Sequence, residues 1–391
     1  MDPLRNPFVP GAGSPPPALI GRNGILRQAE IVLARTLTGR ASKSLILTGL
    51  RGVGKTVLLN RIADMAAEKG YAVVQIEAPE AKKLPGLLIP PLRSLLFQLD
   101  RMEGFSESVK RGLKVLKGFT SALRLKIGEV ELGLEIEPER GTADSGDLDQ
   151  DLPELFVVIA EAARDRGRAI AILIDELQYL GPDELGALIM AVHRVVQKQL
   201  PLVLIGAGLP QILGAAGQSK SYAERLFEFP LVGPLPLPDA KDAIRKPVED
   251  AAESITERAL EATVEQTEGY PYFLQEWGYH LWDYAVRSPI TDLDVSAINH
   301  RVIANLDRSF FRVRFDRLTP REKTYLRVMA ELGPGPHRSG DIAVNMGAAV
   351  QSVAPLRNSL IKKGMIFSPA HGDTAFTVPL FDQFMKRIMP L

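Results

Sequence analysis

The sequence predicts an α/β fold, with a core built on a parallel β-sheet, then a helical unit and a small C-terminal unit of helices and strands. Three observations predict this fold class. A glycine-rich loop at 49–56 joins a short apolar run to a segment with helical spacing, and a second apolar run ends in two adjacent acids at 175 and 176. Prolines at 234, 236 and 238 then separate these segments from a helix-rich remainder.

Composition limits the classes of protein to which the chain can belong. Its 391 residues suffice for two or three domains with buried cores. Lysine plus arginine and aspartate plus glutamate both total 47, so overall charge argues neither for nor against a nucleic-acid partner. Cysteine is absent, which excludes disulfides and thiolate sites, and the five histidines lack metal-ligand spacing. Because no run approaches the ~18 apolar residues of a membrane span and the N-terminus does not resemble a signal peptide, we expect a cytoplasmic protein without membrane contact.

The glycine-rich loop fits the phosphate-binding pattern G-x-x-x-x-G-K-[ST]. It reads Gly49, Leu50, Arg51, Gly52, Val53, Gly54, Lys55 and Thr56, followed by Val57. Gly52 and Gly54 lack a Cβ, so the backbone can bend tightly and turn its N–H groups toward a phosphate at the start of a helix. We expect Lys55 to reach the β- and γ-phosphates and the Thr56 hydroxyl to ligate Mg²⁺. The strand at 44–48 and the helix at 57–66 are the context that this pattern requires, so the chain is predicted to bind a nucleoside triphosphate.

The second apolar run, 169–174, ends in Asp175 and Glu176 and is typical of a buried parallel strand. Ligands of open α/β sheets bind beyond the carboxyl ends of the strands, so both acids are expected at the site. We expect Asp175 to hold Mg²⁺, directly or through water, and Glu176 to accept a proton from the attacking water. The alternative is a buried strand that ends at an ordinary helix N-cap. A second acid placed to activate water favours a hydrolase over a small-molecule kinase.

The segments before and after the loop are expected to surround this core. Residues 1–17 are rich in proline, which favours an extended arm; Phe8 and Val9 could anchor it across the core, and a disordered tail or tag is the alternative. A helix is predicted at 25–34 and a strand at 71–77. Residues 80–122 are predicted to be mostly helical, with a break at Pro90-Pro91. Residues 123–152 read as an insertion, with an alternating β-hairpin and then an acidic exposed loop at 138–152.

Helices and strands alternate in the remainder of the chain. Helices are predicted at 153–166 and 181–199, a strand at 202–208, and a fifth strand just after Arg225. Residues 239–300 are helical, with breaks at Pro247, Gly269 and Pro271. Residues 318–391 run helix, helix, helix, strand, turn, strand, helix, which is the order of a winged helix-turn-helix. Between these two units lies a basic stretch that we expect to be a solvated helix face: Arg308, Arg312, Arg314, Arg317 and Arg321.

With these features the chain resembles P-loop ATPases of the ASCE division, close to the STAND and archaeal-type ATPases and related to initiator-type AAA+ proteins. The resemblance rests on the Gly21-Arg22 pair, the loop at 49–56, the strand and acids at 172–176, and Gly269-Tyr270-Pro271. It implies a P-loop ATPase core at 18–236, a helical lid at 237–312 and a winged helix-turn-helix at 313–391. It also implies that Gly21, Arg22, Tyr270 and Pro271 border the adenine and ribose, which favours ATP over GTP. The absence of a base-reading N-K-x-D motif agrees.

The chain departs from the AAA+ pattern at the end of the fourth strand. A polar residue that senses the γ-phosphate is usual there, whereas this chain has Gly206-Ala207-Gly208. The sensor role is therefore empty or filled by backbone N–H groups. Arg225 matches the arginine that follows this strand in archaeal-type relatives and could contact the γ-phosphate in cis or on a neighbouring copy; an arginine paired on the surface is the alternative.

The leading hypothesis is an ATPase that uses ATP, Mg²⁺ and slow or partner-stimulated hydrolysis to ADP as a conformational switch. The alternative is a DNA-binding winged-helix protein with ATP as a structural or regulatory ligand. The expected recognition helix carries Arg357, Lys362 and Lys363, which is a thin basic set for groove reading. Winged helices of this family also contact partner proteins, and a homo-oligomer is compatible with the resemblance. A third hypothesis is a scaffold that holds a partner through residues 123–152.

Overall fold

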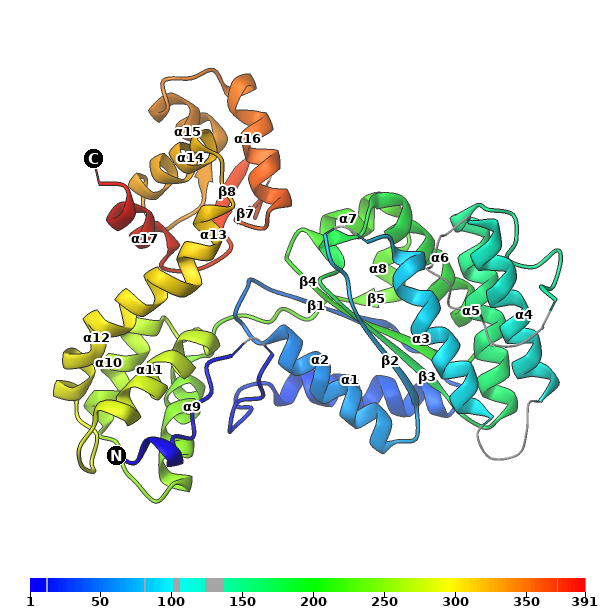
Figure 1. The fold of residues 1–391 in the computed structure, drawn as a ribbon, viewed down its shortest axis with the longest axis horizontal. Coiled ribbons are helices and arrows are strands. Elements are labelled where there is room, and N and C mark those ends of the chain that lie inside the picture. Colours follow the sequence, from blue (N-terminus) through cyan, green and yellow to red (C-terminus); the bar gives the residue numbers. More distant parts are fainter. Residues whose placement is uncertain (12, 81, 101–105, 124–136, 371, 391) are drawn as a thin grey trace.

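The computed structural model describes residues 1–11, 13–80, 82–100, 106–123, 137–370 and 372–390. Its centre is a five-stranded sheet in the order β2-β3-β4-β1-β5, and every neighbouring pair is parallel (Figure 1). The strands are β1 (Ser44–Thr48), β2 (Ala72–Glu77), β3 (Ile170–Asp175), β4 (Leu202–Gly208) and β5 (Phe227–Glu228). The predicted α/β fold with a parallel sheet is confirmed.

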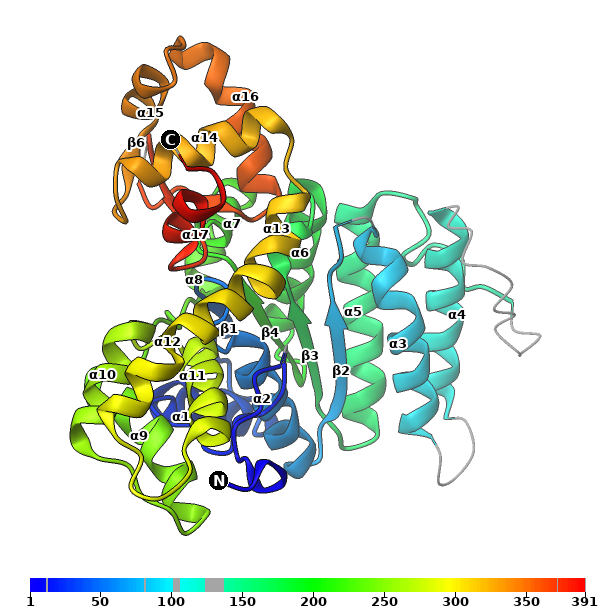
Figure 2. The same ribbon diagram turned by 60° about the vertical axis from the view of Figure 1, so that its left-hand side comes forward.

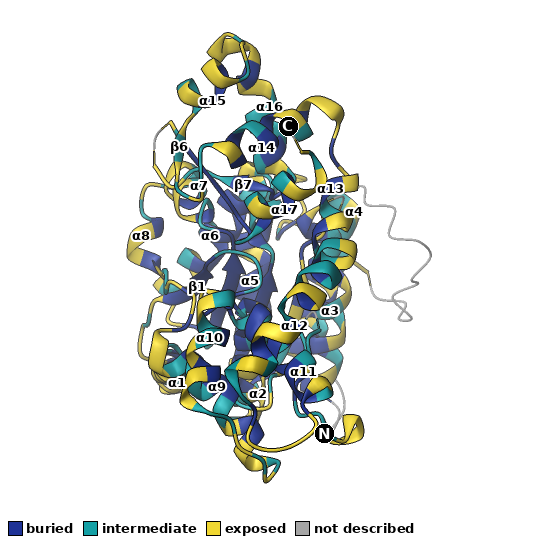
Figure 3. Cartoon of the chain, turned by 90° about the vertical axis from the view of Figure 1, so that its left-hand side faces the viewer, coloured by how far each residue is buried: buried dark blue, intermediate teal, exposed yellow. Residues whose placement is uncertain are grey.

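Helices cover both faces of the sheet because successive side chains of a strand point to opposite faces. Leu45 and Leu47 of β1 pack with α1 (Asn23–Leu37) and α2 (Lys55–Glu68), whereas Ile46 packs on the opposite side. That side is covered by α3 (Leu84–Leu99), α4 (Glu107–Ala122), α5 (Leu148–Asp165) and α6 (Pro182–Gln197), with α7 (Ile212–Ser219) and α8 (Ala223–Leu226) further along the chain. Residues of all three central strands are buried, as the dark centre of Figure 3 shows. The short η2 turn (Leu177–Tyr179) follows β3 directly.

Two sequence-based expectations for the core are wrong. Helix α3 continues through Pro90 and Pro91. Its buried leucines outweigh the backbone hydrogen bonds that the two prolines remove. Residues 138–152 are not simply an exposed loop, because α5 already begins at Leu148 and Asp151 is buried. Asp151 accepts hydrogen bonds from the Ser145 hydroxyl and the Gly146 N–H at 2.8 Å each, which holds this loop against the helix. The expected hairpin at 123–137 lies almost wholly outside the described residues.

A four-helix unit follows the sheet and is called the lid here: α9 (Leu237–Asp250), α10 (Glu257–Thr267), α11 (Pro271–Tyr284) and α12 (Asp292–Leu306). Pro247 does not break α9 as expected, since it lies inside the last turn of that helix. The buried Phe273, Leu274 and Trp277 form the centre of α11. After α12 the π-helical turn η3 (Asp307–Phe311) and α13 (Arg312–Asp316) continue nearly in line toward the C-terminal unit (Figure 2).

The C-terminal unit contains the helices and strands that the sequence predicts, plus one extra strand. Its elements are α14 (Pro320–Glu331), β6 (His337–Arg338), α15 (Ser339–Asn345), α16 (Val350–Lys362), β7 (Ile366–Phe367), β8 (Asp373–Phe376) and α17 (Phe381–Ile388). The three strands form an antiparallel sheet in the order β6-β8-β7. The assignment to the winged-helix class stays a prediction.

The first part of the N-terminal arm, residues 1–9, lies on the lid. A short 3-10 turn, η1 (Pro3–Arg5), precedes Phe8, which is buried, while Val9 remains half exposed. The anchoring role that we expected therefore falls on Phe8, and its partner is the lid helix α11 rather than the sheet core. None of the described helices combines the length and apolar composition that a bilayer-spanning segment needs.

Candidate nucleotide-binding site

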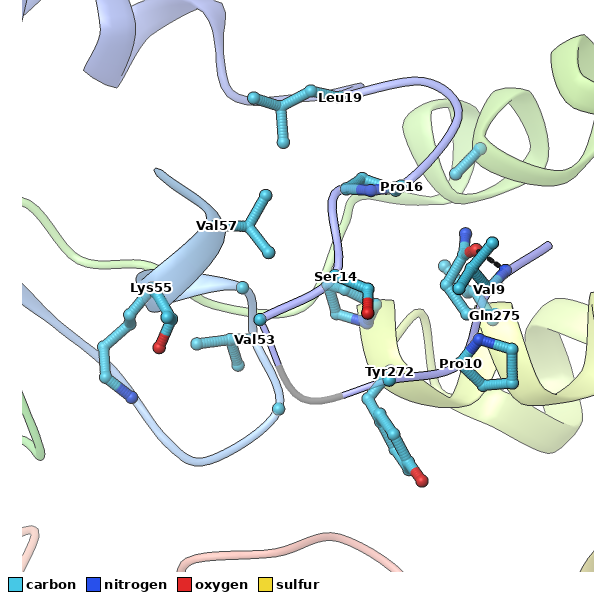
Figure 4. Close-up of a pocket in the computed structure, with 18 of the residues that line it drawn as sticks. Val9, Pro10, Ser14, Pro16, Leu19, Val53, Lys55, Val57, Tyr272 and Gln275 are labelled. Atoms are coloured by element: carbon cyan, nitrogen blue, oxygen red, sulfur yellow. Dashed lines mark hydrogen bonds between the residues drawn. The ribbon is translucent and has the colours of Figure 1, made fainter. Parts of the chain in front are cut away.

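A cavity of about 390 Å³ lies where the loop after β1, the N-terminal arm, the lid and α13 meet (Figure 4). This volume is within the range of small-ligand sites. The predicted residues that line it are Arg22, Arg51, Gly52, Val53, Gly54, Lys55, Thr56, Val57, Glu176 and Pro271. The fold therefore brings together most residues of the predicted site, although they come from four separate segments of the chain.

Positive backbone dihedrals shape the loop between β1 and α2. Gly52 has φ of 82° and Gly54 has φ of 91°, a region in which L-residues are strained. Gly49 is required for another reason, since a Cβ there would lie 2.1 Å from the carbonyl oxygen of Val232. The loop thus adopts the tight conformation expected of a concave anion site at a helix N-terminus.

Lys55 is buried beside this loop. Its ammonium group donates a hydrogen bond to the Leu50 carbonyl at 2.8 Å. Burial lowers the pKa of Lys55 to about 8, while the nearby carboxylates of Glu176 and Asp175 oppose this shift. The ammonium is therefore held close to the loop, in an environment where an additional anion would stabilise its charge.

Asp175 connects β3 to the phosphate loop. The Thr56 hydroxyl donates to Asp175 Oδ2 at 2.6 Å, and the Glu176 N–H donates to Asp175 Oδ1 at 2.8 Å. Burial raises the pKa of the Asp175 carboxyl, and both hydrogen bonds work in the opposite direction. A hydroxyl and a carboxylate in contact are oxygen donors of the kind that Mg²⁺ prefers. The part of the chain that the structure describes contains no cluster of three acidic or histidine side chains that would hold a metal ion by itself, so phosphate and water oxygens would have to complete the coordination.

Glu176 adopts an uncommon backbone conformation at the edge of the cavity. Its φ of 57° is in the left-handed region, which costs energy for a non-glycine residue and is frequent at functional sites. The side-chain amide of Gln178 donates to the Glu176 carboxylate, and Gln178 Oε1 accepts the N–H of Leu209 at 3.0 Å. Gln178 therefore ties the second acid to the end of β4.

The glycines at the end of β4 make room for this arrangement. A Cβ on Gly206 would lie 2.3 Å from Leu177 Cδ1, and a Cβ on Gly208 would lie 3.1 Å from Gln178 Oε1. Sequence analysis identified the missing polar residue at this place but not Gln178. The only sequence signal was its position two residues after the acid, which does not show that η2 folds back onto β4.

Arg51 links the phosphate loop to the C-terminal unit. One guanidinium nitrogen lies 3.7 Å from Glu176 Oε1, and another donates to the Tyr179 hydroxyl at 2.7 Å. The Arg51 N–H donates to the carbonyl of Thr377 at 3.3 Å, and a Cβ on Gly364 would lie 2.7 Å from the guanidinium. A variable position of the loop pattern thus connects the second acid with the C-terminal unit.

The Gly-Arg pair joins the loop to the lid. Arg22 donates to the carbonyls of Val53 at 3.1 Å and Gly233 at 2.6 Å. Burial lowers the pKa of the Arg22 guanidinium and the carboxylate of Asp239 opposes this effect. A Cβ on Gly21 would lie 2.9 Å from Asp239 Oδ2, so the glycine permits the close approach of α9.

The start of lid helix α11 lies directly against the phosphate loop. The N–H of Tyr272 donates to the Gly52 carbonyl at 3.1 Å. Pro271 lines the cavity, whereas the neighbouring Tyr270 is buried and packs against Phe273 at a ring distance of 5.8 Å. Contact of Tyr270, Pro271, Gly21 and Arg22 with a nucleotide remains a prediction.

Arg314 of α13 is a cavity residue that sequence analysis placed on a solvated face. Its guanidinium lies 3.9 Å from the centre of the Phe310 ring, and that ring stacks on Tyr272 at 4.6 Å. Burial lowers the pKa of Arg314 to about 10, and repulsion from Arg51 adds to the shift, so it stays charged at neutral pH. No carboxylate of the described residues forms an ion pair with it, in contrast to Arg312, which pairs with Asp316 at 2.9 Å.

Arg225 lies away from the cavity. It belongs to α8 and is exposed, just before β5, whose Phe227 is paired with Ser44 at the start of β1. The phosphate loop follows the other end of β1, about 13 Å away at a rise of ~3.3 Å per residue. This strand register places Arg225 at the end of β1 that lies opposite the phosphate loop, so contact of Arg225 with the γ-phosphate in the same chain is not expected. Contact with a neighbouring copy stays a prediction.

Two parts of the chain match known protein families. Residues 18–205 match the family described as AAA ATPase domain. This part of the chain is a P-loop ATPase domain of the AAA class. Residues 308–385, which include α13 and most of the C-terminal unit, match the family described as Domain of unknown function (DUF8462). Comparison with curated protein sequences gives no match.

Solved structures resemble this chain over most of its length. The Walker-type ATPase paby2304 of Pyrococcus abyssi is 18% identical with a TM-score of 0.59, and the alignment covers 94% of this chain and 96% of that one. Aeropyrum pernix ORC1 in complex with DNA has 15% identity and a TM-score of 0.49, with 98% and 96% coverage. The Thermotoga maritima RuvB Holliday junction branch migration motor has 15% identity and a TM-score of 0.45, with 91% and 92% coverage. The first of these supports the fold of nearly the whole chain, and the predicted P-loop ATPase class is confirmed.

Proposed function

We propose that the protein binds ATP with Mg²⁺ in this cavity and hydrolyses it as a switch that couples the ATPase core, the lid and the C-terminal unit. The observation that carries the proposal is the Thr56–Asp175 hydrogen bond with Glu176 next to it, at the mouth of a loop with the backbone dihedrals of an anion site. The Thr56 hydroxyl, the Glu176 carboxylate and the loop glycines thereby line one cavity, and Asp175 contacts Thr56 next to it.

Each residue has a separate task in this proposal. The N–H groups of the loop and the Lys55 ammonium bind the phosphates, and Thr56 with Asp175 would hold the metal. Mg²⁺ would neutralise part of the negative charge of the phosphates. Glu176, fixed by Gln178, orients a water molecule and accepts its proton as the oxygen attacks the γ-phosphate. The apolar part of the lining, which includes Ile20, Val57 and Leu274, suits a purine ring.

Contacts from two other parts of the chain to one loop support the role as a switch. The lid contacts Gly52 through the Tyr272 N–H, and the C-terminal unit contacts Arg51 through the Thr377 carbonyl. Arg314 of α13 lines the same cavity. A change in phosphate charge in this cavity acts on both contacts and on the Arg314 charge together, which is how loss of a γ-phosphate releases a closed arrangement.

The test is phosphate release by the purified chain with ATP, in the presence of Mg²⁺ and of EDTA, and with GTP for comparison. We expect Mg²⁺-dependent hydrolysis of ATP at a low rate. Neither binding nor hydrolysis of ATP would contradict the proposal. The same assay with duplex DNA at low and physiological salt tests the DNA-binding alternative, since binding through phosphates depends strongly on salt.

The structure gives the DNA-binding alternative little support in α16. Arg357 donates to the Thr374 hydroxyl at 3.0 Å and to the Ser368 hydroxyl at 2.8 Å. Lys363, just after the helix, donates to Glu322 at 2.7 Å. Two of the three basic side chains expected to face DNA are therefore used inside the C-terminal unit, so we expect no stimulation of hydrolysis by DNA.

Arg314→Met is expected to weaken ATP binding ~10-fold and ADP binding less. The substitution removes a half-buried charge that has no ion-pair partner in the described chain, while it keeps an apolar contact with Phe310; a charge-assisted hydrogen bond to phosphate accounts for about this factor. Calorimetric titration with ATP and with ADP measures both affinities. Arg312→Met, on the exposed side of the same helix, is the control. Equal loss for the two variants would exclude a specific role of Arg314.

A further inference from the structure

We propose that the N-terminal arm is a strap that closes the cavity over a bound nucleotide and limits the rate at which the nucleotide leaves. The proposal rests on the proposed function, because the ligand enclosed by the strap is ATP. It assigns a role in ligand binding to a segment, residues 1–17, that precedes the matched AAA domain.

The arm is anchored on one side of α11. The Phe8 ring is 2% exposed, and a Cβ on Gly278 would lie 2.6 Å from two of its ring atoms. The missing side chain at Gly278 thus forms a socket on the helix surface that accepts the ring. Burial of one phenyl ring contributes enough apolar area to hold a short segment in place.

Hydrogen bonds that precede Phe8 in the chain fix the direction of the arm along α11. The Asn6 side chain donates to the Tyr279 carbonyl at 3.0 Å and to Asp283 Oδ1 at 2.9 Å. The Trp282 indole N–H donates to the Asp2 carbonyl at 2.8 Å. These contacts use the backbone carbonyls and side chains of α11, so the first eight residues follow the lid.

Beyond Phe8 the arm crosses from the lid to the phosphate loop. The Val9 N–H donates to Gln275 Oε1 at 3.3 Å, and Val9, Pro10 and Ser14 line the cavity (Figure 4). Gly13 has φ of 73°, and a Cβ on it would lie 3.5 Å from Thr56 Cγ2. The arm therefore passes in contact distance of the residue expected to hold Mg²⁺, at the start of α2.

The crossing segment contributes its own residues to the cavity wall, beside those of the core and the lid. Ser14 forms no hydrogen bond with any residue that the structure describes, and its hydroxyl is available to a ligand. Pro16, Leu19 and Ile20 continue the same wall with apolar groups. Because one end is fixed on the lid and the other leads into α1 of the core, opening this wall requires either that Phe8 leaves its socket or that lid and core separate.

The test follows release of ATP from the full-length protein by displacement of a fluorescent ATP analogue, bound with Mg²⁺, in a stopped-flow instrument. We expect Phe8→Ala to release the analogue at least ~10-fold faster, since loss of a buried aromatic side chain removes the main apolar anchor of the strap. Leu4→Ala is the matched control, because Leu4 is in the same arm and is 95% exposed. Asn6→Ala, which removes two hydrogen bonds to α11 and the one that Asn6 Oδ1 accepts from the Phe8 N–H, is the second variant and is expected to change the rate in the same direction.

Equal release rates for wild type, Phe8→Ala and Asn6→Ala would overturn the role of the strap. Failure of the proposed function has a different signature, because wild type itself would then not bind the analogue. Thermal unfolding of each variant without nucleotide shows whether it is folded. If Phe8→Ala is not folded, the comparison between Asn6→Ala and Leu4→Ala decides.

Discussion

Glu176→Gln is expected to reduce ATP turnover by ~10²–10⁴-fold while ATP binding is retained, which is the usual contribution of a positioned general base. Glutamine has nearly the same shape, so it can keep the place of the side chain at the cavity edge beside Gln178 and Arg51. It cannot accept a proton from water at neutral pH. The variant should therefore bind Mg²⁺ and ATP and stay in the ATP-bound arrangement.

Phosphate release and calorimetric titration on the same preparation separate these two effects. Glu224→Gln is the control, because Glu224 is exposed on α8 and does not line the cavity. If the Glu176 variant hydrolyses ATP at the wild-type rate, another group activates the water. If it binds no ATP, the carboxylate has a structural role at the loop, and its left-handed backbone is the first feature to reconsider.

Local patterns were sufficient to predict the strands and the phosphate loop. β1 and β4 have the limits that the sequence predicts, since a parallel strand buried on both faces reads as a nearly continuous apolar run. The glycines of the loop were predictable because positive φ is required there. In α3, by contrast, tertiary burial of leucines outweighs the local cost of two prolines, and local reasoning predicted a break.

Contacts between distant segments were not predictable from such patterns. Gln178 meets the end of β4 only because Gly206 and Gly208 leave space for η2. Arg314 was expected on a solvated face since it belongs to a basic stretch, yet α13 turns it toward the loop while Arg312 stays outside. The partner of Phe8 is a socket at Gly278, and nothing near either residue in the sequence indicates the other. The fold thus brings together the phosphate-loop residues that the sequence predicts, and their contact with a nucleotide stays a prediction; the contributions of lid, arm and C-terminal unit were predicted only in part.

Lys55→Ala is expected to weaken ATP binding by ~10²-fold or more, because a charge-assisted hydrogen bond to phosphate is lost at a buried position. Truncation of a buried side chain usually lowers the unfolding temperature. In the protein without nucleotide we expect Lys55→Ala not to lower it. The ammonium is buried with a single carbonyl acceptor, and burial lowers its pKa to about 8, so the charged form costs free energy before a phosphate is bound. The variant without nucleotide should consequently unfold at the same temperature as wild type or a higher one.

Addition of ATP and Mg²⁺ should then reverse the order of stability. Wild type gains stability according to the ratio of ATP concentration to Kd, whereas the Lys55 variant gains little at the same concentration. Thermal unfolding with and without ATP measures both the stability of the free protein and its stabilisation by ATP. Lys69→Ala, just after the same helix and paired on the surface with Glu30 at 3.6 Å, should keep the full ATP-dependent shift. A Lys55 variant that unfolds at a lower temperature without nucleotide but shows the wild-type shift with ATP would make this lysine a structural residue of the loop, and phosphate binding would then depend on the backbone N–H groups and Arg314.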